Sequence, residues 1–296
     1  MDGNLANAVR PSAETAINVA PSGPLLGAEI SGVDLTKPLT QAEVAAIRAA
    51  LLQHKVIFFR DQDISYADHV RFGRYFGDLE GHPVTATVPG FPEILFIEAA
   101  DGMKISDKLY PIARPANKWH TDVTFREKPS MGGILRMRKM PAFGGDTIFA
   151  DTAAIYSDLP PEVKAKIDIL DAEHDIIRSY GYRVTPEKAA QLRAEYPLMI
   201  HPVVRRHPET GEKHLFVNHV FTARILGLPD DEAEKLLAYL LDRVKAPEYQ
   251  IRFRWGENAI AFWDNRATQH YGVLDYWPHE RIVERVTVMG EERPSR

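Results

Sequence analysis

The chain of 296 residues contains no cysteine, which excludes disulfide bonds and thiolate metal ligands. It has no apolar run near the roughly 18–20 residues that a membrane-spanning helix requires. It also lacks a long basic run, and 36 basic against 41 acidic residues give a net charge of −5. We therefore expect neither a membrane nor a nucleic acid as a partner.

The N-terminal segment lacks the apolar core of a secretory signal peptide. Residues 1–23 are polar and carry alanine, proline and serine, so we expect a flexible tail and a cytoplasmic protein. The remaining residues, 24–296, contain no linker rich in proline, glycine and serine. An apolar fraction of 45% is typical of a globular protein with a sizeable core. The sequence predicts a single domain over residues 24–296.

Short strand patterns dominate the chain, and helices are grouped near the start and in the second half. Capping-box patterns at residues 40–43 and 65–68 predict that helices follow directly. Further helices are expected at residues 161–170, 187–196 and 230–245. The order predicts a mainly β fold with helical additions, such as a sandwich or jelly roll. Strands are expected at residues 55–60, 94–97, 119–125, 133–137, 147–150, 203–206, 214–218, 250–255, 259–263 and 281–289.

A His-x-Asp triplet, His120 and Asp122, lies in the run WHTDVTF of residues 119–125. The valine, threonine and phenylalanine favour a strand, on which residues two apart project from the same face. Both side chains would then reach one metal ion. A histidine alone is more often a hydrogen-bonded structural residue. His207 and Glu209 form a second such triplet, in a polar turn that we expect to be solvated.

A second candidate imidazole, His270, ends the run WDNRATQH far downstream. Two imidazoles and one carboxylate make the facial triad of non-heme Fe(II) oxygenases. Such a triad leaves the opposite metal positions open for a co-substrate and O2. The sequence therefore predicts His120, Asp122 and His270 as metal ligands.

Two arginines mark the last expected strand. Arg281 and Arg285 lie four residues apart, on one face and roughly 13 Å from each other along the strand. If that face is buried, both charges need partners, and arginine suits the bidentate recognition of carboxylates and related oxyanions. The alternative is a pair of surface arginines that bridge to Glu280 or Glu284.

Together these runs resemble the TauD/TfdA family of Fe(II)/2-oxoglutarate-dependent dioxygenases, from about Gly27 to Gly290. The resemblance implies the double-stranded β-helix, a jelly roll, with Fe(II) as cofactor and 2-oxoglutarate and O2 as co-substrates. We also expect a homo-oligomer. The motifs that carry the resemblance are residues 55–60 (KVIFFR), 119–125 (WHTDVTF), 144–147 (GGDT), 201–205 (HPVVR), 207–211 (HPETG) and 263–271 (WDNRATQHY), with Arg281 and Arg285.

The resemblance also implies roles for single residues. The iron ligands would be His120, Asp122 and His270. Thr147 and Arg281 would hold the distal carboxylate of 2-oxoglutarate, and Arg285 would bind the acidic group of the prime substrate. Thr147 is also compatible with an ordinary strand threonine.

Within the family, the chain is most similar to the taurine dioxygenase branch. There, the position of His82 contacts the sulfonate, and the positions of Tyr180 and Phe221 line the pocket. His82 could instead cap a turn, and the two aromatics could be ordinary core residues. Thr85 and Ala116 depart from the tyrosine and asparagine of that branch, and the second change resembles the alkylsulfatase relatives.

The resemblance implies hydroxylation of the carbon next to the sulfonate of taurine or a related alkylsulfonate. The 2-oxoglutarate would become succinate and CO2, and the hydroxylated product would collapse to an aldehyde and sulfite. An alkylsulfatase or an aryloxyalkanoate dioxygenase of the same family is the alternative. A catalytically silent jelly-roll binding protein is disfavoured by the complete triad and both arginines.

Overall fold

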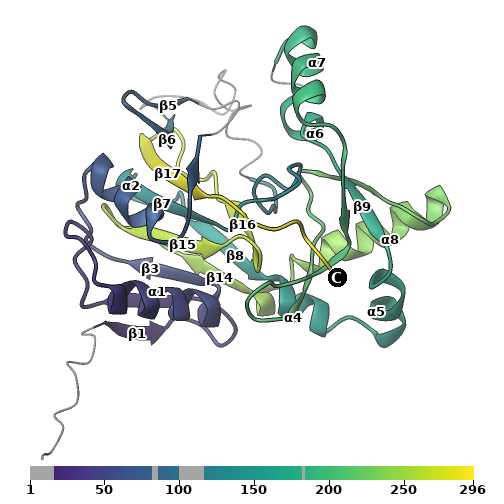
Figure 1. Ribbon diagram of the computed structural model, residues 1–296, viewed down its shortest axis with the longest axis horizontal. Coiled ribbons are helices and arrows are strands. Elements are labelled where there is room, and N and C mark those ends of the chain that lie inside the picture. Colours follow the sequence, from purple (N-terminus) through teal and green to yellow (C-terminus); the bar gives the residue numbers. More distant parts are fainter. Residues whose placement is uncertain (1–16, 82–85, 100–116, 182–183) are drawn as a thin grey trace, which may run out of the picture.

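The computed structural model describes residues 17–81, 86–99, 117–181 and 184–296. Its largest sheet has nine strands (Figure 1). All neighbours pair antiparallel except β2 and β3, which are parallel. In order, its strands are β1 (Asn18–Pro21), β2 (Ala28–Ser31), β3 (Val56–Phe59), β15 (Ile260–Asp264), β7 (Gly132–Lys139), β17 (Arg281–Val288), β6 (Phe91–Ala99) and β5 (Thr87–Val88), with β4 (Leu79–Glu80) also paired to β17.

A three-stranded sheet faces the large one. It consists, in order, of β14 (Gln250–Phe253), β8 (Thr147–Asp151) and β16 (Thr268–Gly272). Aromatic side chains from both sheets meet between them. Phe58 of β3 stacks on Phe253 of β14 with ring centroids 3.9 Å apart, and Phe149 of β8 lies 5.8 Å from Trp263 of β15. This apolar core holds the two sheets in the sandwich arrangement that was predicted.

Two helices pack against the outer side of the large sheet, α1 (Gln41–His54) on β3 and β15 and α2 (Tyr66–Arg74) on β6 and β17. Both begin with the capping boxes that were predicted. The Thr40 hydroxyl accepts from the Glu43 backbone N–H, and the Glu43 carboxylate accepts from the Thr40 backbone N–H at 2.7 Å. These bonds satisfy backbone donors that the first helical turn leaves unpaired.

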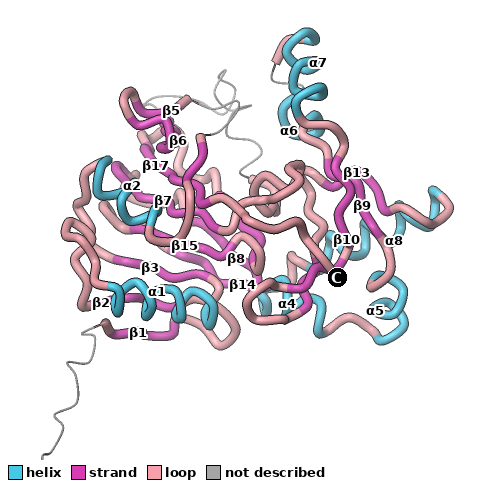
Figure 2. The backbone as a smooth tube through the Cα atoms, in the orientation of Figure 1, coloured by secondary structure: helices cyan, strands magenta, loops and turns pink. Residues whose placement is uncertain are grey.

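A long insertion between β8 and β14 supplies most of the remaining helices, which gather on one side of the molecule (Figures 1 and 2). It also contains a small sheet in the order β10, β9, β13 and the hairpin β11–β12. The elements are α4 (Thr152–Ser157), α5 (Pro161–Ile167), β9 (Asp171–His174), α6 (Ile177–Tyr180), α7 (Pro186–Glu195), β10 (Met199–Pro202), β11 (Val204–Arg206), β12 (Lys213–Leu215), β13 (Thr222–Ile225), α8 (Asp230–Arg243) and the 3-10 helix η2 (Pro247–Tyr249).

The prediction of a strand at residues 119–125 is wrong. His120 makes an isolated bridge with His270, and the chain then enters a turn. Val123 has a φ of 47°, in the left-handed region that a β-branched residue rarely adopts and a strand does not contain. The alternation of side chains along a strand therefore does not bring His120 and Asp122 together.

The expected tail boundary at residue 23 is also wrong. Residues 18–21 form β1, and their backbone groups pair with residues 28–31 of β2. A single domain over residues 24–296 stays a prediction. Within the described ranges, no helix combines the length and the apolar character that crossing a membrane requires.

Candidate metal centre

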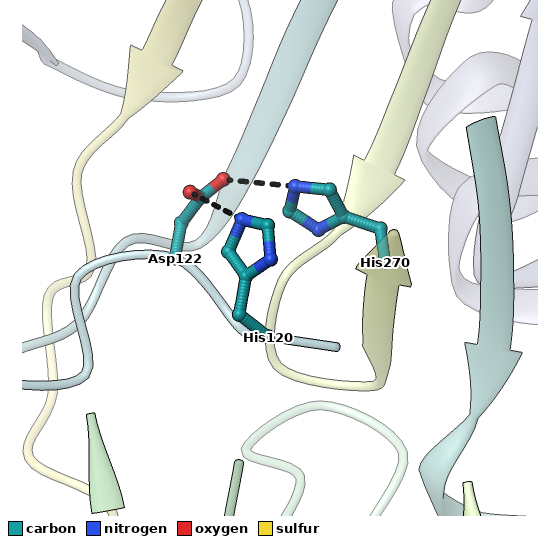
Figure 3. A group of neighbouring side chains, drawn as sticks. All are labelled: His120, Asp122 and His270. Carbon is teal, nitrogen blue, oxygen red and sulfur yellow. Dashed lines mark ion pairs between the residues drawn. The ribbon is translucent and has the colours of Figure 1, made fainter. Parts of the chain in front are cut away.

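Three buried side chains, His120, Asp122 and His270, point toward one another (Figure 3). Nε2 of His120 lies 3.7 Å from Oδ1 of Asp122, and Nε2 of His270 lies 3.8 Å from Oδ2. The candidate ligand atoms all lie within 4.8 Å of one another. This spacing fits one divalent ion with metal–ligand bonds of about 2.0–2.2 Å to imidazole and carboxylate.

The two histidines are fixed to each other through their backbones. The N–H of His120 donates to the carbonyl of His270 at 3.1 Å, and the N–H of His270 donates to the carbonyl of His120 at 2.8 Å. Nδ1 of His120 lies 2.7 Å from the carbonyl oxygen of Lys118. Because a carbonyl only accepts, Nδ1 carries the proton, and Nε2 presents its lone pair to a metal.

Asp122 is brought to the histidines by the turn and not by a strand. Its backbone N–H donates to the side-chain oxygen of Asn265 at 2.9 Å. Nη1 of Arg285 donates to Oδ2 of Asp122 at 2.8 Å. Burial by itself raises the pKa of the Asp122 carboxyl, but the charge and hydrogen bond of Arg285 together with the two neighbouring imidazoles outweigh burial and hold the pKa well below its usual range. Asp122 is therefore an anion across the physiological pH range.

The two imidazoles are neutral in this environment. Burial lowers the pKa of His120, and burial together with the adjacent His120 ring lowers the pKa of His270 well below its usual value. A neutral imidazole and an ionised carboxylate are the forms that bind a metal. The donor set therefore fits a divalent ion such as Fe(II).

Arg281 extends from β17 beside the glycine loop before β8. Its Nη2 donates to the Gly145 carbonyl at 3.2 Å, while its Nε is buried without a hydrogen-bond partner. Gly145 has a φ of 74°, and a Cβ there would lie 2.9 Å from Nε of Arg281. Among the described residues, no carboxylate forms an ion pair with Arg281. A buried guanidinium without a counter-ion fits the distal carboxylate of 2-oxoglutarate.

Thr147 begins β8, two residues after Gly145, and its side chain is 8% exposed. Its hydroxyl oxygen accepts a hydrogen bond from Nε1 of Trp255 at 3.0 Å. The hydroxyl proton therefore stays available for a ligand oxygen. This arrangement is compatible with the expected role of Thr147 in binding the distal carboxylate of 2-oxoglutarate. Trp255, which the sequence did not indicate, orients the Thr147 hydroxyl.

The expected substrate residues are only partly described. Tyr180 and Phe221 are buried in one apolar cluster that also contains Val123, next to Asp122 in the chain. The structure thus brings both aromatics together beside the turn that carries Asp122, where they also serve as core residues. His82 lies outside the described residues, as do Thr85 and Ala116.

The surface alternative for the two arginines is wrong. Arg285 is only 9% exposed and pairs with Asp122. Glu284 points to the other face of β17, where Nε of Arg138 lies 3.2 Å from its Oε1. Glu280 pairs with Lys139 at 2.5 Å. The two acids therefore have cationic partners of their own on β7.

The expectation of a solvated His207 is also wrong. Its side chain is 1% exposed, and Nε2 lies 3.0 Å from Oδ2 of Asp264. The backbone N–H groups of Glu209 and Thr210 donate to Nδ1, so Nε2 carries the proton. The turn is polar, but it folds back over its own histidine, a tertiary contact that the local sequence does not encode.

A sandwich of two sheets with a buried cluster of two histidines and one aspartate defines a mononuclear, non-heme metal enzyme of the jelly-roll class. Comparison with known proteins identifies the family. The model of the taurine catabolism dioxygenase TauD, TfdA family matches residues 18–287. The chain belongs to this family.

Three relatives illustrate the similarity. An α-ketoglutarate-dependent sulfate ester dioxygenase of Pseudomonas putida is 40% identical, over 97% of this chain and 94% of its own length. An alkylsulfatase of Acinetobacter baylyi is 37% identical, over 90% of this chain and 83% of its own length. The crystal structure of a taurine dioxygenase from Burkholderia xenovorans superposes with a TM-score of 0.79 at 38% identity, covering 93% of this chain and 90% of that one.

The predicted jelly roll and the predicted class of enzyme are confirmed. The chain is a 2-oxoglutarate-dependent dioxygenase, with Fe(II) as cofactor and 2-oxoglutarate and O2 as co-substrates. Homo-oligomerisation and a cytoplasmic location stay predictions.

Proposed function

We propose that this chain hydroxylates the carbon that bears the sulfate or sulfonate group of an alkyl sulfate ester or an alkylsulfonate. The similarity to a sulfate ester dioxygenase and to an alkylsulfatase supports the first substrate class. The similarity to a taurine dioxygenase supports the second. Taurine, the substrate that the sequence suggested first, is retained as one member of the sulfonate class.

The observation that carries this proposal is the position of Arg285. Its guanidinium is buried, contacts Asp122 through Nη1, and keeps Nε without a hydrogen-bond partner. An oxyanion bound by the remaining donors lies beside the metal ligand Asp122. The carbon attached to that oxyanion is then the part of the substrate held near the metal, which selects it for oxidation.

The other residues have separate roles in this proposal. Arg281 and Thr147 bind the distal carboxylate of 2-oxoglutarate, and the metal is held by His120, Asp122 and His270. Bound Fe(II) supplies the activation of O2 that converts 2-oxoglutarate to succinate and CO2 and delivers one oxygen atom to the substrate. The protein orients the carbon–hydrogen bond and excludes water from the site.

The far end of the substrate is expected to meet apolar side chains. Tyr180 and Phe221 belong to an apolar cluster with Val123, Ile176 and Val220. An ammonium group placed against it would lose water without gaining a charged partner. We therefore propose that an uncharged alkyl tail is preferred to the amine of taurine, and that His82 assists Arg285 at the oxyanion.

The fate of the product distinguishes the two substrate classes. Hydroxylation of the carbon of a sulfate ester breaks a carbon–hydrogen bond and gives an unstable intermediate that releases an aldehyde and sulfate. The same step on a sulfonate releases an aldehyde and sulfite. In each case one O2 and one 2-oxoglutarate are consumed, and one succinate and one CO2 are formed.

A substrate panel tests the proposal. Hexyl sulfate, pentanesulfonate, taurine and 2,4-dichlorophenoxyacetate are compared by kcat/KM for succinate, with sulfate and sulfite measured in parallel. The Asp122→Ala protein, purified in the same way, serves as the blank for contaminating activity. We expect the first two compounds to give succinate and the matching sulfur anion in equal amounts.

Two outcomes would contradict the proposal. Succinate release driven only by the aryloxyacetate would place the chain among the aryloxyalkanoate oxygenases. A preference for taurine of a hundredfold or more, about 2.7 kcal/mol, would show that another residue supplies an amine contact.

A further inference from the structure

The side chain of Asn265 forms hydrogen bonds with both backbone groups of Asp122, the N–H and the carbonyl oxygen. Oδ1 of Asn265 accepts the N–H of Asp122 at 2.9 Å, and Nδ2 donates to the carbonyl oxygen of Asp122 at 3.0 Å. Nδ2 also donates to the Ser130 hydroxyl at 2.9 Å. Asn265 is 1% exposed, so these bonds form away from water. One carboxamide thus holds both ends of the loop from residue 122 to residue 130.

This contact compensates for the missing strand at residues 119–125. A residue in a sheet has its N–H and C=O paired by a neighbouring strand, but Asp122 lies at a turn. Val123 follows it with a φ of 47°, a conformation that a valine adopts only when its surroundings enforce it. The carboxamide of Asn265 takes the place of the peptide group of a neighbouring strand. It satisfies both backbone groups of Asp122 and holds the strained turn.

Asn265 lies close in sequence to β16, the strand that carries His270, and is bonded to the residue before β7. It lies in the turn between β15 and β16, and its N–H donates to the Met131 carbonyl at 2.9 Å. In the same turn, the hydroxyl of Thr268 donates to the carbonyl of Asp264 at 2.9 Å. Asn265 therefore connects the loop of Asp122 rigidly to the start of the strand of His270.

We propose that Asn265 is a positioning residue for the metal site: it sets the place of the Asp122 carboxylate relative to the two imidazoles before any metal binds. The inference rests on the proposed role of His120, Asp122 and His270 as metal ligands. Hydrogen bonds that orient a metal ligand contribute to metal affinity because the ligand then need not be ordered on binding. Loss of the contact should therefore weaken metal binding first, and turnover only as a consequence.

The test measures metal affinity directly. Mn(II) is titrated into the metal-free full-length chain by isothermal calorimetry, for the wild type and for Asn265→Ala. We expect the Kd to rise about 10- to 100-fold in the variant. The melting temperature of the metal-free protein and the increase on adding Mn(II) are recorded for the same samples.

Asn218 provides a matched control. It is also 1% exposed, its Oδ1 accepts the N–H groups of Val220 and Phe221 at 3.1 and 2.9 Å, and its Nδ2 donates to the Thr124 hydroxyl at 3.1 Å. It contacts none of the proposed ligands. Asn218→Ala should lower the melting temperature as Asn265→Ala does, but leave the Kd for Mn(II) unchanged. Equal Kd values for wild type and Asn265→Ala, or equal increases in both variants, would overturn the inference.

Two further variants keep the test decisive. Asp122→Ala should abolish Mn(II) binding; if its Kd equals that of the wild type, the proposed metal site itself fails. If Asn265→Ala does not fold, Asn265→Leu replaces it, because leucine has a similar size and can form neither of the two hydrogen bonds to Asp122. A higher Kd than in the wild type supports the positioning role, and an equal Kd contradicts it.

Discussion

Two groups of buried charged side chains lie near the turn between β15 and β16, and they differ in how completely they are paired. In the first, Asp264 accepts from Nε and Nη2 of Arg266 at 2.9 and 2.7 Å and from His207 at 3.0 Å. Nη1 of Arg266 pairs with Glu209 at 2.8 Å. No side-chain nitrogen or oxygen of Asp264, Arg266 or His207 is left buried without a partner.

The second group, at the candidate metal centre, is incomplete. Nε of Arg281, Nε of Arg285 and Nδ1 of His270 are buried without hydrogen-bond partners. Asp122 is the only described carboxylate that pairs with Arg285. A buried polar group without a partner costs free energy unless a ligand or water satisfies it, so these three atoms are candidate contacts for ligands at the site. The contrast agrees with a structural role for the complete group and with the proposed role of the incomplete group in binding metal, 2-oxoglutarate and substrate.

The largest expected effect is on turnover. Asp122→Ala removes the one carboxylate from the metal site and should abolish succinate formation. It also leaves the buried Arg285 without its ion-pair partner, so the metal-free protein should fold with a lower free energy of unfolding. Succinate formation is measured in Fe(II)-replete buffer, and circular dichroism reports the fold. Full activity of this variant would rule out Asp122 as a ligand.

The next effect is on stability and concerns the complete group. Asp264→Asn leaves Arg266 and His207 without their buried anion and should lower the free energy of unfolding by about 3–5 kcal/mol. Urea unfolding of the metal-free protein measures it. A decrease below about 1 kcal/mol is the size expected for an exposed ion pair. Such a result would contradict the claim that the buried, fully paired group stabilises the fold.

A smaller effect concerns buried histidines away from the metal. Burial lowers the pKa of His69 and of His201 to about 4, below the usual value of 6.5. The unfolded chain therefore binds protons between pH 6.5 and about 4 that the folded chain does not. The stability is fully present above that range and falls as the pH decreases through it, by up to about 1.4 kcal/mol per pH unit for each histidine.

His69→Gln tests this pH dependence. His69 donates through Nε2 to the carbonyl of Ile134 at 3.1 Å, and glutamine offers a similar donor without titrating. The free energy of unfolding, measured in urea at pH 7, 6 and 5, should fall less steeply in the variant than in the wild type. Identical slopes would show that His69 does not contribute.

Much of the fold and the metal site follows from the sequence because the signals are local or recur in a family. The capping boxes at Thr40 and Ser65 predicted two helices, and the alternation along residues 281–289 predicted a strand with both arginines on one face. The His-x-Asp triplet and the distant His270 predicted the three side chains that converge.

The rest depends on tertiary contacts that local patterns do not encode. Residues 119–125 have strand-forming side chains, but the carboxamide of Asn265 holds Asp122 in a turn. His207 was expected in solvent, but it is buried against Asp264, a residue 57 positions away. Asp264 and Asn265 both lie in the run WDNRATQH, which the sequence analysis singled out, yet only the structure shows which partners they bind.

The central claim is that the two incompletely paired arginines of β17 bind different ligands, and steady-state kinetics of Arg281→Ala and Arg285→Ala tests it most directly. Each lost charge-assisted contact should cost about 1.5–3 kcal/mol, or about 10- to 150-fold. Arg224→Ala, which breaks a surface pair with Glu173, is the control and should change neither constant.

We expect Arg281→Ala to raise the apparent KM for 2-oxoglutarate. Arg285→Ala should instead reduce kcat/KM for the alkyl sulfate or alkylsulfonate and leave a slow formation of succinate that no longer responds to that substrate. If both variants changed only the constants of the prime substrate, or both changed only those of 2-oxoglutarate, the assignment of separate ligands to Arg281 and Arg285 would be contradicted.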